Sequence, residues 1–378
     1  MAANTESGLQ IRSLVKKPGV LEVSLVSVPT PEPAADEIVI RVEATPINPS
    51  DIALLLGPVD MNTAKQSGSA DSPVFTANIL ERAIPALSAR FDQSMPVGNE
   101  GAGTVVKAGA SPAAQALMGK LVAVASGSMY SQYKLAKAGE ALVLPSGTTP
   151  QQAASCFVNP LTALSMVEVM RREGHKALVH TAAASNLGQM LNKICLRDGV
   201  SLVNVVRSAE QAKILKELGA KIVLDSTSPR FMPELIEAVS ATEATLAFDA
   251  IGGGMMASQI LTAMEAAAVA RMTSYNRYGS STFKQVYIYG MLDTSRTELT
   301  RTFGLSWSVS GWLLTPFLQK IGLADVNRLR QRVVSELTTT FASHYTKEIS
   351  LRDVAKLEIA QAYNRRATGE KFLIIPTR

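Results

Sequence analysis

The sequence predicts an α/β protein in which a doubly wound parallel sheet is joined to a mostly β domain. Two observations support this. Between residues 177 and 224, apolar runs of strand length alternate with amphipathic stretches of helical period, which indicates parallel strands connected by helices. Before about residue 156, short β-rich segments alternate with Pro and Gly turns. At 378 residues and 47% hydrophobic, the chain can form two domains with their own cores.

The first strand of the predicted sheet covers residues 177–179. A turn of small residues at 182–185 follows it, and apolar residues then recur with a helical period from Leu187 to Cys195. Asp198 and Gly199 are expected to end this helix. Strand, turn and helix therefore succeed one another as in one half of a strand–helix–strand unit.

The second predicted strand covers residues 201–206. Ser208 and Gln211 have the spacing of a capping box at the start of a second helix, and Gly219 stands at its C-terminal stop. A third strand begins at residues 221–224. Ligands of doubly wound sheets bind outside the carboxyl ends of the strands, so the loops after these strands are the expected site.

The turn after the first strand is a candidate phosphate-binding loop. The three glycine positions of the dinucleotide fingerprint G-x-G-x-x-G are held by Ala183, Ser185 and Gly188. A pyrophosphate binds backbone N–H groups at a helix N-terminus, and small residues let the backbone come close to it. Since two glycines are missing, a plain strand–helix turn is the alternative interpretation.

Arg207, at the end of the second strand, indicates which dinucleotide would bind. The residue that reads the adenosine ribose lies about 20 residues beyond the glycine turn, and Arg207 follows Ser185 by 22 residues (207 − 185). No Asp or Glu occurs between Gly199 and Ala209. A carboxylate there would repel a 2′-phosphate, whereas a guanidinium binds it with a planar set of donors. The sequence therefore predicts NADPH as the cofactor, with a solvated surface arginine as the alternative.

Composition argues against several other classes of protein. The net charge of +5 is spread along the chain, which gives little support for nucleic-acid binding. No run approaches the roughly 18 apolar residues of a membrane span. The N-terminal MAANTESGLQ lacks the features of a secretory signal, so a cytoplasmic protein is expected. Cys156 and Cys195 are expected to be buried, reduced thiols.

Segments on both sides of the predicted sheet complete the second domain. Residues 57–95 are poorly periodic and are expected to form a long surface excursion, with one helical stretch near 75–89. An amphipathic helix is expected at 326–337 and a closing strand at 371–375, which would return to the first domain.

Motifs along almost the whole chain carry a family resemblance. They are INPSDI (47–52), PVGNEGAGTVVKAG (96–109), NPLTAL (159–164), NVVRS (204–208), KELGAKIVLD (216–225), FDAIGG (248–253), YIYGML (287–292), SGWLL (310–314) and TGEKFLIIP (368–376). Their order and spacing resemble the medium-chain dehydrogenase/reductase superfamily, and within it the zinc-free branch of quinone reductases and enoyl-thioester reductases.

The resemblance implies a GroES-like catalytic domain, residues 1–156 and 308–378, interrupted by a Rossmann domain, residues 157–307. It implies an active site in the cleft between these domains and a homodimer joined through the edges of the Rossmann sheets. It also implies further cofactor contacts at Asn159, Asn186, Leu187, Ile251, Gly290 and Met291.

The sequence offers few zinc ligands. A catalytic zinc needs three protein ligands and a structural zinc needs four, but the chain has two cysteines and three histidines, and the histidines are scattered. Where zinc-containing relatives carry Cys or His, this chain has residues 48–51, NPSD, and 98–100, GNE. Both zinc sites are therefore expected to be absent.

Without a Lewis acid, the expected reaction is hydride delivery from the nicotinamide to the β-carbon of a conjugated carbonyl compound. Hydrogen-bond donors would stabilise the anion that forms. The resemblance places Asn48 and Thr162 near the nicotinamide. Their alternative roles are a turn residue before Pro49 and a hydroxyl at a helix N-terminus.

The proton donor is the main departure from the family. Enoyl-thioester reductases carry a tyrosine at a position that aligns with Val59, and no tyrosine occurs from residue 53 to 97. Tyr130 is the candidate replacement, with a core aromatic as its alternative interpretation; Tyr275 or water are further options, and a quinone would need no fixed acid. The segment 271–283 is also longer than usual, and it is expected either to arrange the dimer edge or to add cofactor contacts.

Three functions are consistent with these observations. The expected one is a zinc-independent, NADPH-dependent reductase of an activated C=C bond in enones, enals or enoyl thioesters. The second is an NADPH:quinone oxidoreductase. The third is an NADPH-binding sensor or scaffold with little catalysis, because the glycine turn is degenerate and the tyrosine is missing.

Overall fold

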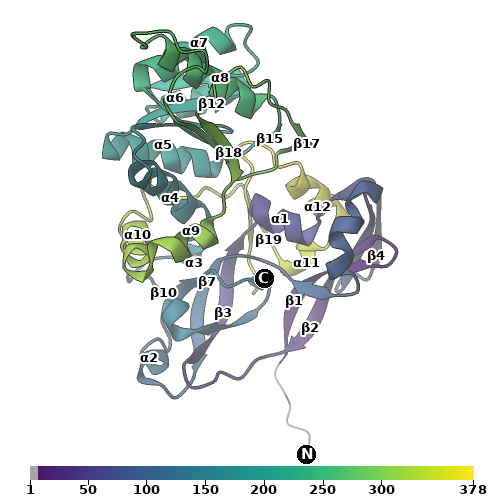
Figure 1. Ribbon diagram of the computed structural model, residues 1–378. Helices are drawn as coiled ribbons and strands as arrows, with labels where there is room; N and C mark the ends of the chain where they lie inside the picture. The colour runs from purple at the N-terminus through teal and green to yellow at the C-terminus, as the bar shows by residue number, and fades with distance from the viewer. Residues whose placement is uncertain (1–6) are drawn as a thin grey trace, which may run out of the picture. The chain divides into compact units, whose positions relative to one another are not determined.

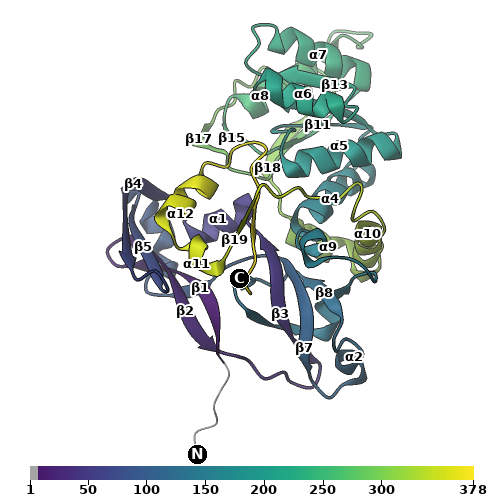
Figure 2. The same ribbon diagram turned by 180° about the vertical axis from the view of Figure 1, so that it is seen from behind.

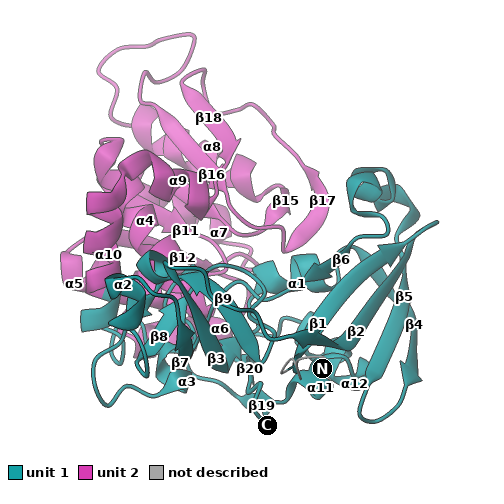
Figure 3. Ribbon diagram, turned by 90° about the horizontal axis from the view of Figure 1, so that it is seen from below, with its two compact units in different colours: residues 1–158, 333–378 teal, residues 159–332 magenta. Residues whose placement is uncertain are grey.

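The computed structural model describes residues 7–378, so the first six residues of the N-terminal stretch used for the location prediction lie outside it. The chain forms two compact units (Figure 3). Unit 1 comprises residues 1–158 and 333–378, and unit 2 comprises residues 159–332. An inserted unit was expected, but its C-terminal boundary lies at Arg332 and not at 307.

The later boundary has a structural cause. Residues 307–311 add a strand to the sheet of unit 2. Further along, Arg328 pairs with Glu168 (3.1 Å) and Arg332 pairs with Asp198 (2.7 Å). These contacts keep the chain within unit 2 for two more helices.

Unit 1 is built from antiparallel strands. They are β1 (Ser7–Lys16), β2 (Val20–Pro29), β3 (Glu37–Pro46), β4 (Val59–Gly68), β5 (Pro73–Ile79), β6 (Ser94–Pro96), β7 (Gly101–Ala108), β8 (Leu121–Val124), β9 (Tyr133–Lys137), β10 (Leu142–Val143), β19 (Lys347–Ile349) and β20 (Phe372–Ile374). One sheet has the order β4-β5-β2-β1-β6 and the other β10-β8-β7-β3-β20-β19, with β9 also paired to β3. Among these strand pairs, only the pair of β19 with β20 is parallel. The mostly β prediction for this part of the chain is confirmed.

Short helices connect these strands. They are α1 (Pro49–Leu55), α2 (Pro112–Gln115), α3 (Pro150–Ala153), α11 (Leu351–Val354) and α12 (Leu357–Asn364), with 3-10 turns η1 (Glu81–Ala83), η2 (Pro85–Arg90) and η3 (Ala138–Glu140). Each is stabilised mainly by packing on the sheets, since isolated helices of this length are unstable in water.

The helix predicted near residues 75–89 is wrong over residues 75–79, whereas residues 81–83 and 85–90 form the 3-10 turns η1 and η2. Residues 73–79 form strand β5, which pairs with both β2 and β4. Phe75, Ala77 and Ile79 point into the core, whereas Thr76 and Asn78 do not, so burial has the period of two that defines a strand. The expected surface excursion is therefore a hairpin that belongs to the sheet.

Unit 2 alternates strands with helices. The strands are β11 (Ala177–His180), β12 (Ser201–Val206), β13 (Ile222–Asp225), β14 (Leu246–Asp249), β15 (Gly252–Gly254), β16 (Lys284–Ile288), β17 (Asp293–Thr297) and β18 (Trp307–Gly311). The helices are α4 (Val158–Arg172), α5 (Asn186–Asp198), α6 (Ala209–Glu217), α7 (Phe231–Thr242), α8 (Met256–Val269), α9 (Leu314–Ile321) and α10 (Leu323–Ser335). They can be followed in Figure 1 and, from behind, in Figure 2.

Six of these strands form one parallel sheet, in the order β13-β12-β11-β14-β16-β18. Val203 and Val205 of β12 belong to the apolar cluster that includes α7 and α8. Asn204, between them, reaches Asn192 of α5 on the other face (3.4 Å). Helices therefore cover both faces, which confirms the predicted doubly wound sheet.

One helical stretch, Pro150–Arg172, is long and apolar enough to cross a membrane by length and composition. Its most apolar window is 94% buried within the structure, as is usual for a core helix of a globular protein. This stretch is therefore only weak evidence for a membrane span.

Both cysteines are free and buried, as predicted. Burial raises the pKa of Cys195 to about 12 and also raises the pKa of Cys156. Both side chains are therefore neutral thiols near neutral pH.

Candidate functional site

The strand order of unit 2 marks the expected ligand position. Counted in chain order, the sheet reads 3-2-1-4-5-6, so the direction of winding reverses between β11 and β14. Ligands of doubly wound sheets bind outside the carboxyl ends of the strands at this reversal. The loops after β11, β12, β14 and β16 contain most of the predicted cofactor contacts.

The turn between β11 and α5 keeps one of the three fingerprint glycines because packing requires it. A Cβ on Gly188 would lie 2.2 Å from the carbonyl oxygen of Ala183, far inside any contact distance. Ser185 is the N-cap of α5, and its Oγ accepts a hydrogen bond from the Gly188 N–H (3.2 Å). Ala182 adopts a φ of 49°, in the region that favours glycine. The turn is thus formed with alanines where glycines are usual.

Asn186 and Leu187 are the first two residues of α5. The first N–H groups of a helix have no partner within the helix and carry the positive end of its dipole. Ala183 and Ala184 pack against Val206 and Leu215, so small side chains line the approach to these amides. The turn has the features that a pyrophosphate needs.

Asp249, at the end of β14, organises the neighbouring loop. Its Oδ1 accepts hydrogen bonds from Thr181 Oγ1 (2.7 Å) and from the N–H of Ile251 (2.9 Å). Its Oδ2 accepts from the N–H of Gly252 (3.1 Å), and Thr181 Oγ1 accepts from the N–H of Ala250 (2.8 Å). The loop with the predicted contact Ile251 is thereby tied to the end of β11.

Thr181 and Asp249 were not recognised from the sequence. Their positions could have identified them. Thr181 directly follows β11 and Asp249 is the last residue of β14, the two strands between which the direction of winding reverses. Both side chains are fully buried, which is unusual for polar residues at the ends of strands.

The loop after β16 carries Gly290 and Met291. A Cβ on Gly290 would lie 2.5 Å from the carbonyl oxygen of Ala250, so only glycine fits there. Met291 is 71% exposed. Just before them, Tyr289 Oη lies 2.7 Å from Nε2 of His180, and burial lowers the pKa of this histidine to about 3. His180 is therefore a neutral member of the sheet core.

Arg207 directly follows β12 and is exposed. Among residues 7–378 no ion pair involves its guanidinium. Ser208 Oγ accepts from the Gln211 N–H (3.3 Å), so Ser208 caps helix α6 as predicted. Oε1 of Gln211 accepts from the backbone N–H of Arg207 (3.0 Å), one residue before the N–H that a capping box uses. The backbone at Arg207 is thus held in place while the side chain has no acidic partner.

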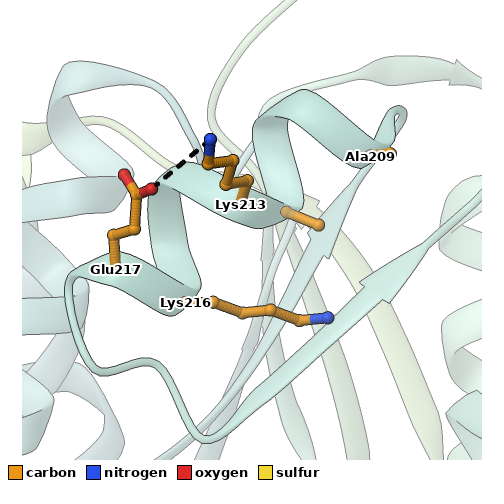
Figure 4. Close-up of a pocket in the computed structure, with 5 residues that line it drawn as sticks. Ala209, Lys213, Lys216 and Glu217 are labelled. Atoms are coloured by element: carbon orange, nitrogen blue, oxygen red, sulfur yellow. Dashed lines mark ion pairs between the residues drawn. The ribbon is translucent and has the colours of Figure 1, made fainter.

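Two lysines lie further along α6. They border a shallow depression of about 430 Å³ (Figure 4), lined by Ala209, Ala212, Lys213, Lys216 and Glu217. Lys213 Nζ lies 3.8 Å from Glu217 Oε1, and Lys216 points away from this pair (Figure 4). The depression contains neither Arg207 nor any residue of the β11–α5 turn, so we do not assign the cofactor to it.

Asn159 and Thr162 lie in the first two turns of α4, and each is 7% exposed. Their position near a helix N-terminus agrees with the alternative role suggested for Thr162. The proposed role of both residues beside the nicotinamide stays a prediction.

Asn48 belongs to a buried polar cluster in unit 1. It is 1% exposed and is the N-cap of α1. Its Nδ2 donates to Oε1 of Glu100 (2.7 Å), and its backbone N–H donates to Oδ2 of Asp51 (2.8 Å). The N–H of Asn99 donates to Oδ1 of Asp51 (2.8 Å). Residues at positions where zinc-containing relatives carry ligands are therefore joined to one another by hydrogen bonds.

Two buried carboxylates and one lysine set the electrostatics of this cluster. Burial raises the pKa of Asp51 to about 7, and nearby Glu100 adds to the rise. Burial also raises the pKa of Glu100, against the attraction of Lys371. Burial lowers the pKa of Lys371 to about 8, and its Nζ donates to Ser155 Oγ (3.0 Å). Within residues 7–378, no group of three or more His, Cys, Asp or Glu is arranged to hold a metal ion.

The two candidate tyrosines lie in different surroundings. Tyr130 is 0% exposed, its Oη donates to the carbonyl oxygen of Pro46 (3.1 Å), and burial raises its pKa well above the usual value. Tyr130 belongs to the apolar core cluster of unit 1, as its alternative interpretation has it, and its catalytic role stays a prediction. Tyr275 is 91% exposed in the 271–283 segment. Val59 packs against the apolar core of unit 1.

No protein-family model matches the chain. Among curated proteins, mitochondrial enoyl-[acyl-carrier-protein] reductase 2 of Candida tropicalis is 26% identical over 243 residues, which are 58% of each chain. A quinone oxidoreductase of Pseudomonas aeruginosa is 26% identical over 159 residues, 41% of this chain and 49% of the relative. The alignments thus span about half of the length of these relatives.

Solved structures match over the full length. A Mesorhizobium loti protein proposed to be an NADPH:quinone reductase is 24% identical with a TM-score of 0.73, covering 100% of both chains. Quinone oxidoreductase of Escherichia coli, crystallised with NADPH, is 18% identical with a TM-score of 0.66, covering 97% of this chain and 100% of the other. The chain therefore has the fold of these solved structures, and the curated relatives that it matches are named as quinone and enoyl reductases, in agreement with the resemblance found in the sequence.

Proposed function

We propose that this protein is a zinc-independent, NADPH-dependent reductase of an activated C=C bond in a conjugated carbonyl compound. The observation that carries the proposal is the unpaired, exposed Arg207 beside the tightly packed Gly188 turn. Support also comes from the names of the relatives, which include enoyl reductases, and from the NADPH in the crystallised neighbour. When bound, NADPH supplies a hydride.

The described residues fit this cofactor. The first turn of α5 offers N–H groups to a pyrophosphate, with Asn186 and Leu187 as its first residues. Arg207 would bind the 2′-phosphate through its planar set of donors. Ile251 and Gly290 lie on loops tied to the ends of β14 and β11 by the hydrogen bonds of Asp249 and by close packing on Ala250.

The reduction needs a hydride at the β-carbon and a proton at the α-carbon. We propose Asn48 and Thr162 as the side chains that hydrogen-bond the reacting groups. Because Val59 is packed in the core and Tyr130 is committed to Pro46, water is the proposed source of the proton. The lack of a fixed acid favours the second candidate, a quinone oxidoreductase, since a hydroquinone anion takes its protons from solvent.

The proposal is tested by NADPH oxidation in steady state, scanned over trans-2-hexenal, crotonyl-CoA and 1,4-benzoquinone. We expect turnover with an enal or enoyl thioester, and at most comparable turnover with the quinone. Quinone turnover alone would support the second candidate. Tight NADPH binding without turnover of any acceptor would reject the reductase and would favour the third candidate, an NADPH-binding sensor or scaffold.

Arg207→Ala is expected to weaken NADPH binding by roughly 10–150-fold while changing the affinity for NADH less than about threefold. A hydrogen-bonded charge contributes about 1.5–3 kcal/mol, and only NADPH carries the 2′-phosphate. Binding is measured by fluorescence titration of both cofactors. Lys216→Ala is the matched control, because it removes a positive charge from helix α6 and not from the end of β12. A larger loss in Lys216→Ala, or equal affinity of the wild type for both cofactors, would refute the assignment.

The remaining expectations are also proposals. We propose that unit 1 is the GroES-like catalytic part and unit 2 the Rossmann part. A homodimer is proposed through β18, which forms the end of the unit 2 sheet among the described strands. A cytoplasmic location stays a prediction, because the relatives include mitochondrial enzymes.

A further inference from the structure

Glu100 has both carboxylate oxygens engaged by groups that come from different parts of the chain. Its side chain is 0% exposed. Oε1 accepts a hydrogen bond from Nδ2 of Asn48 (2.7 Å). Oε2 accepts from the backbone N–H groups of Phe157 (2.8 Å) and Val158 (3.0 Å). One buried side chain therefore joins a candidate active-site amide to a specific backbone segment.

That backbone segment is the start of helix α4. Val158 is the first residue of the helix, and Asn159 and Thr162 follow in its first two turns. The N–H groups at the start of a helix lack partners within it, and a negative charge there is favourable. Glu100 thus serves as the cap of the helix that carries two further candidate site residues.

Glu100 is itself firmly held. The hydroxyl of Thr45 donates to its backbone carbonyl oxygen (2.6 Å). Glu100 directly precedes strand β7, and Thr45 lies in β3, which pairs with β7. Lys371 supplies a compensating positive charge, which attracts the carboxylate. A buried carboxylate that is paired and fully hydrogen-bonded has little freedom to rotate.

We propose that Glu100 is a positioning residue, which orients the amide of Asn48 and the first turn of α4 together and thereby sets the hydride-transfer geometry. This inference rests on the proposed reductase function. Glu100 does not touch substrate or cofactor in it. A carboxylate is suited to the task because it offers acceptors on both oxygens, whereas an amide offers one oxygen and a donor.

Glu100→Gln separates the two contacts. The glutamine oxygen can still accept from Phe157 and Val158, but its NH₂ group then faces Nδ2 of Asn48, so the Asn48 amide must turn over. We expect kcat, measured with the best of the three acceptors above, to fall roughly 10–100-fold, because small misplacements of reacting groups lower the rate by about this factor. The Kd for NADPH should change less than about twofold.

A double-mutant cycle with Asn48→Ala tests whether Glu100 acts through Asn48. If it does, Glu100→Gln should slow the Asn48→Ala variant by less than about twofold, because coupled residues are not additive. The matched control is Glu265→Gln combined with Lys284→Met: Glu265 is another buried carboxylate, 6% exposed, hydrogen-bonded to Ser280 and Lys284 in unit 2, and the two changes remove both charges together. It should leave kcat within about twofold. Additive losses, or an unchanged kcat in Glu100→Gln, would overturn the inference.

Hydrogen exchange gives a readout that does not depend on activity. The amides of Phe157 and Val158 should be protected in the wild type and in Glu100→Gln, and should exchange at least roughly tenfold faster in Glu100→Ala. The side-chain NH₂ signal of Asn48 should shift in both variants. Unchanged exchange and an unchanged Asn48 signal would refute the positioning role. If those changes occur but the wild type turns over no acceptor, the proposed function fails and the role of Glu100 in the geometry stands.

Discussion

Lys284→Met is expected to destabilise unit 2 by about 3–5 kcal/mol, because it leaves a buried carboxylate without its positive partner. Lys284 is 0% exposed and its Nζ donates to Oε2 of Glu265 (2.6 Å). It also donates to Ser280 Oγ (3.1 Å) and to the carbonyl oxygen of Thr282 (2.8 Å). Methionine has a similar volume, so the loss would come from charge and hydrogen bonding and not from packing.

The two tryptophans, Trp307 and Trp312, lie in unit 2, so denaturant unfolding followed by tryptophan fluorescence reports on this unit. Adding Glu265→Gln to Lys284→Met removes the uncompensated charge and should recover at least half of the lost stability. Lys176→Met is the control, since its pair with Glu243 is exposed and should contribute little to stability. A Lys284→Met variant within 1 kcal/mol of the wild type would contradict the role assigned to this pair.

The same pair explains the long segment 271–283. Glu265 Oε1 accepts from the Ser280 N–H (2.7 Å). A Cβ on Gly279 would lie 2.3 Å from that oxygen, and one on Gly304 would lie 2.6 Å from it, with φ values of 84° and 68°. The end of the segment is therefore anchored on α8 by a buried charge with glycines fitted around it. This anchoring does not test the two roles that the sequence suggested for the segment, which were to arrange the dimer edge or to add cofactor contacts.

Stability of unit 1 is expected to fall as pH rises from about 4 to about 7, through Asp51. Its pKa is raised from 3.8 to about 7 by burial. Between these values the folded state binds more protons than the unfolded chain, so the free energy of unfolding decreases with increasing pH. Asp51 alone would account for a decrease on the order of 4 kcal/mol. Glu100, whose pKa is also raised, acts in the same direction.

Asp51→Asn isolates the contribution of this residue. The variant should be less dependent on pH than the wild type in thermal unfolding between pH 4 and 7, a window below the pKa of about 8 at Lys371. Asp353→Asn is the matched control, because Asp353 changes stability with pH in the opposite direction to Asp51. Hydrogen bonds from Lys356 and Ser350 overcome burial and lower the pKa of Asp353, so its contribution is lost as pH falls. Parallel pH profiles for wild type and Asp51→Asn would contradict the raised pKa.

Local patterns were enough to predict the sheet of unit 2 and the cofactor turn. The strand and helix between Ala177 and Asp198 agree with the structure within one residue at each end, because apolar period and the glycine at 199, with a φ of 67°, act over a few neighbouring residues. The position of Arg207 after a buried strand also follows from the chain alone. So does the resemblance, which depends on motif order.

Pairing partners were not predictable in this way. Residues 75–89 were expected to be helical, yet strand β5 forms because β2 and β4 provide hydrogen-bond partners on both sides. The burial of Tyr130 and its hydrogen bond to the carbonyl oxygen of Pro46 could not be read from the sequence either. A short apolar segment or a lone hydroxyl does not reveal its neighbours, which come from distant parts of the chain.

The sequence by itself determined the doubly wound sheet, the turn of small residues before α5 and the position of Arg207 directly after β12, since these depend on patterns among residues close in the chain. Only the tertiary structure decided that Asn48, Asp51, Glu100 and Lys371 form one buried polar cluster. The sequence could not show this, because up to 323 positions separate them (371 − 48). Two buried carboxylates and a lysine are stable only where folding brings their charges and hydrogen-bond partners together. That physical requirement has no counterpart in local sequence pattern.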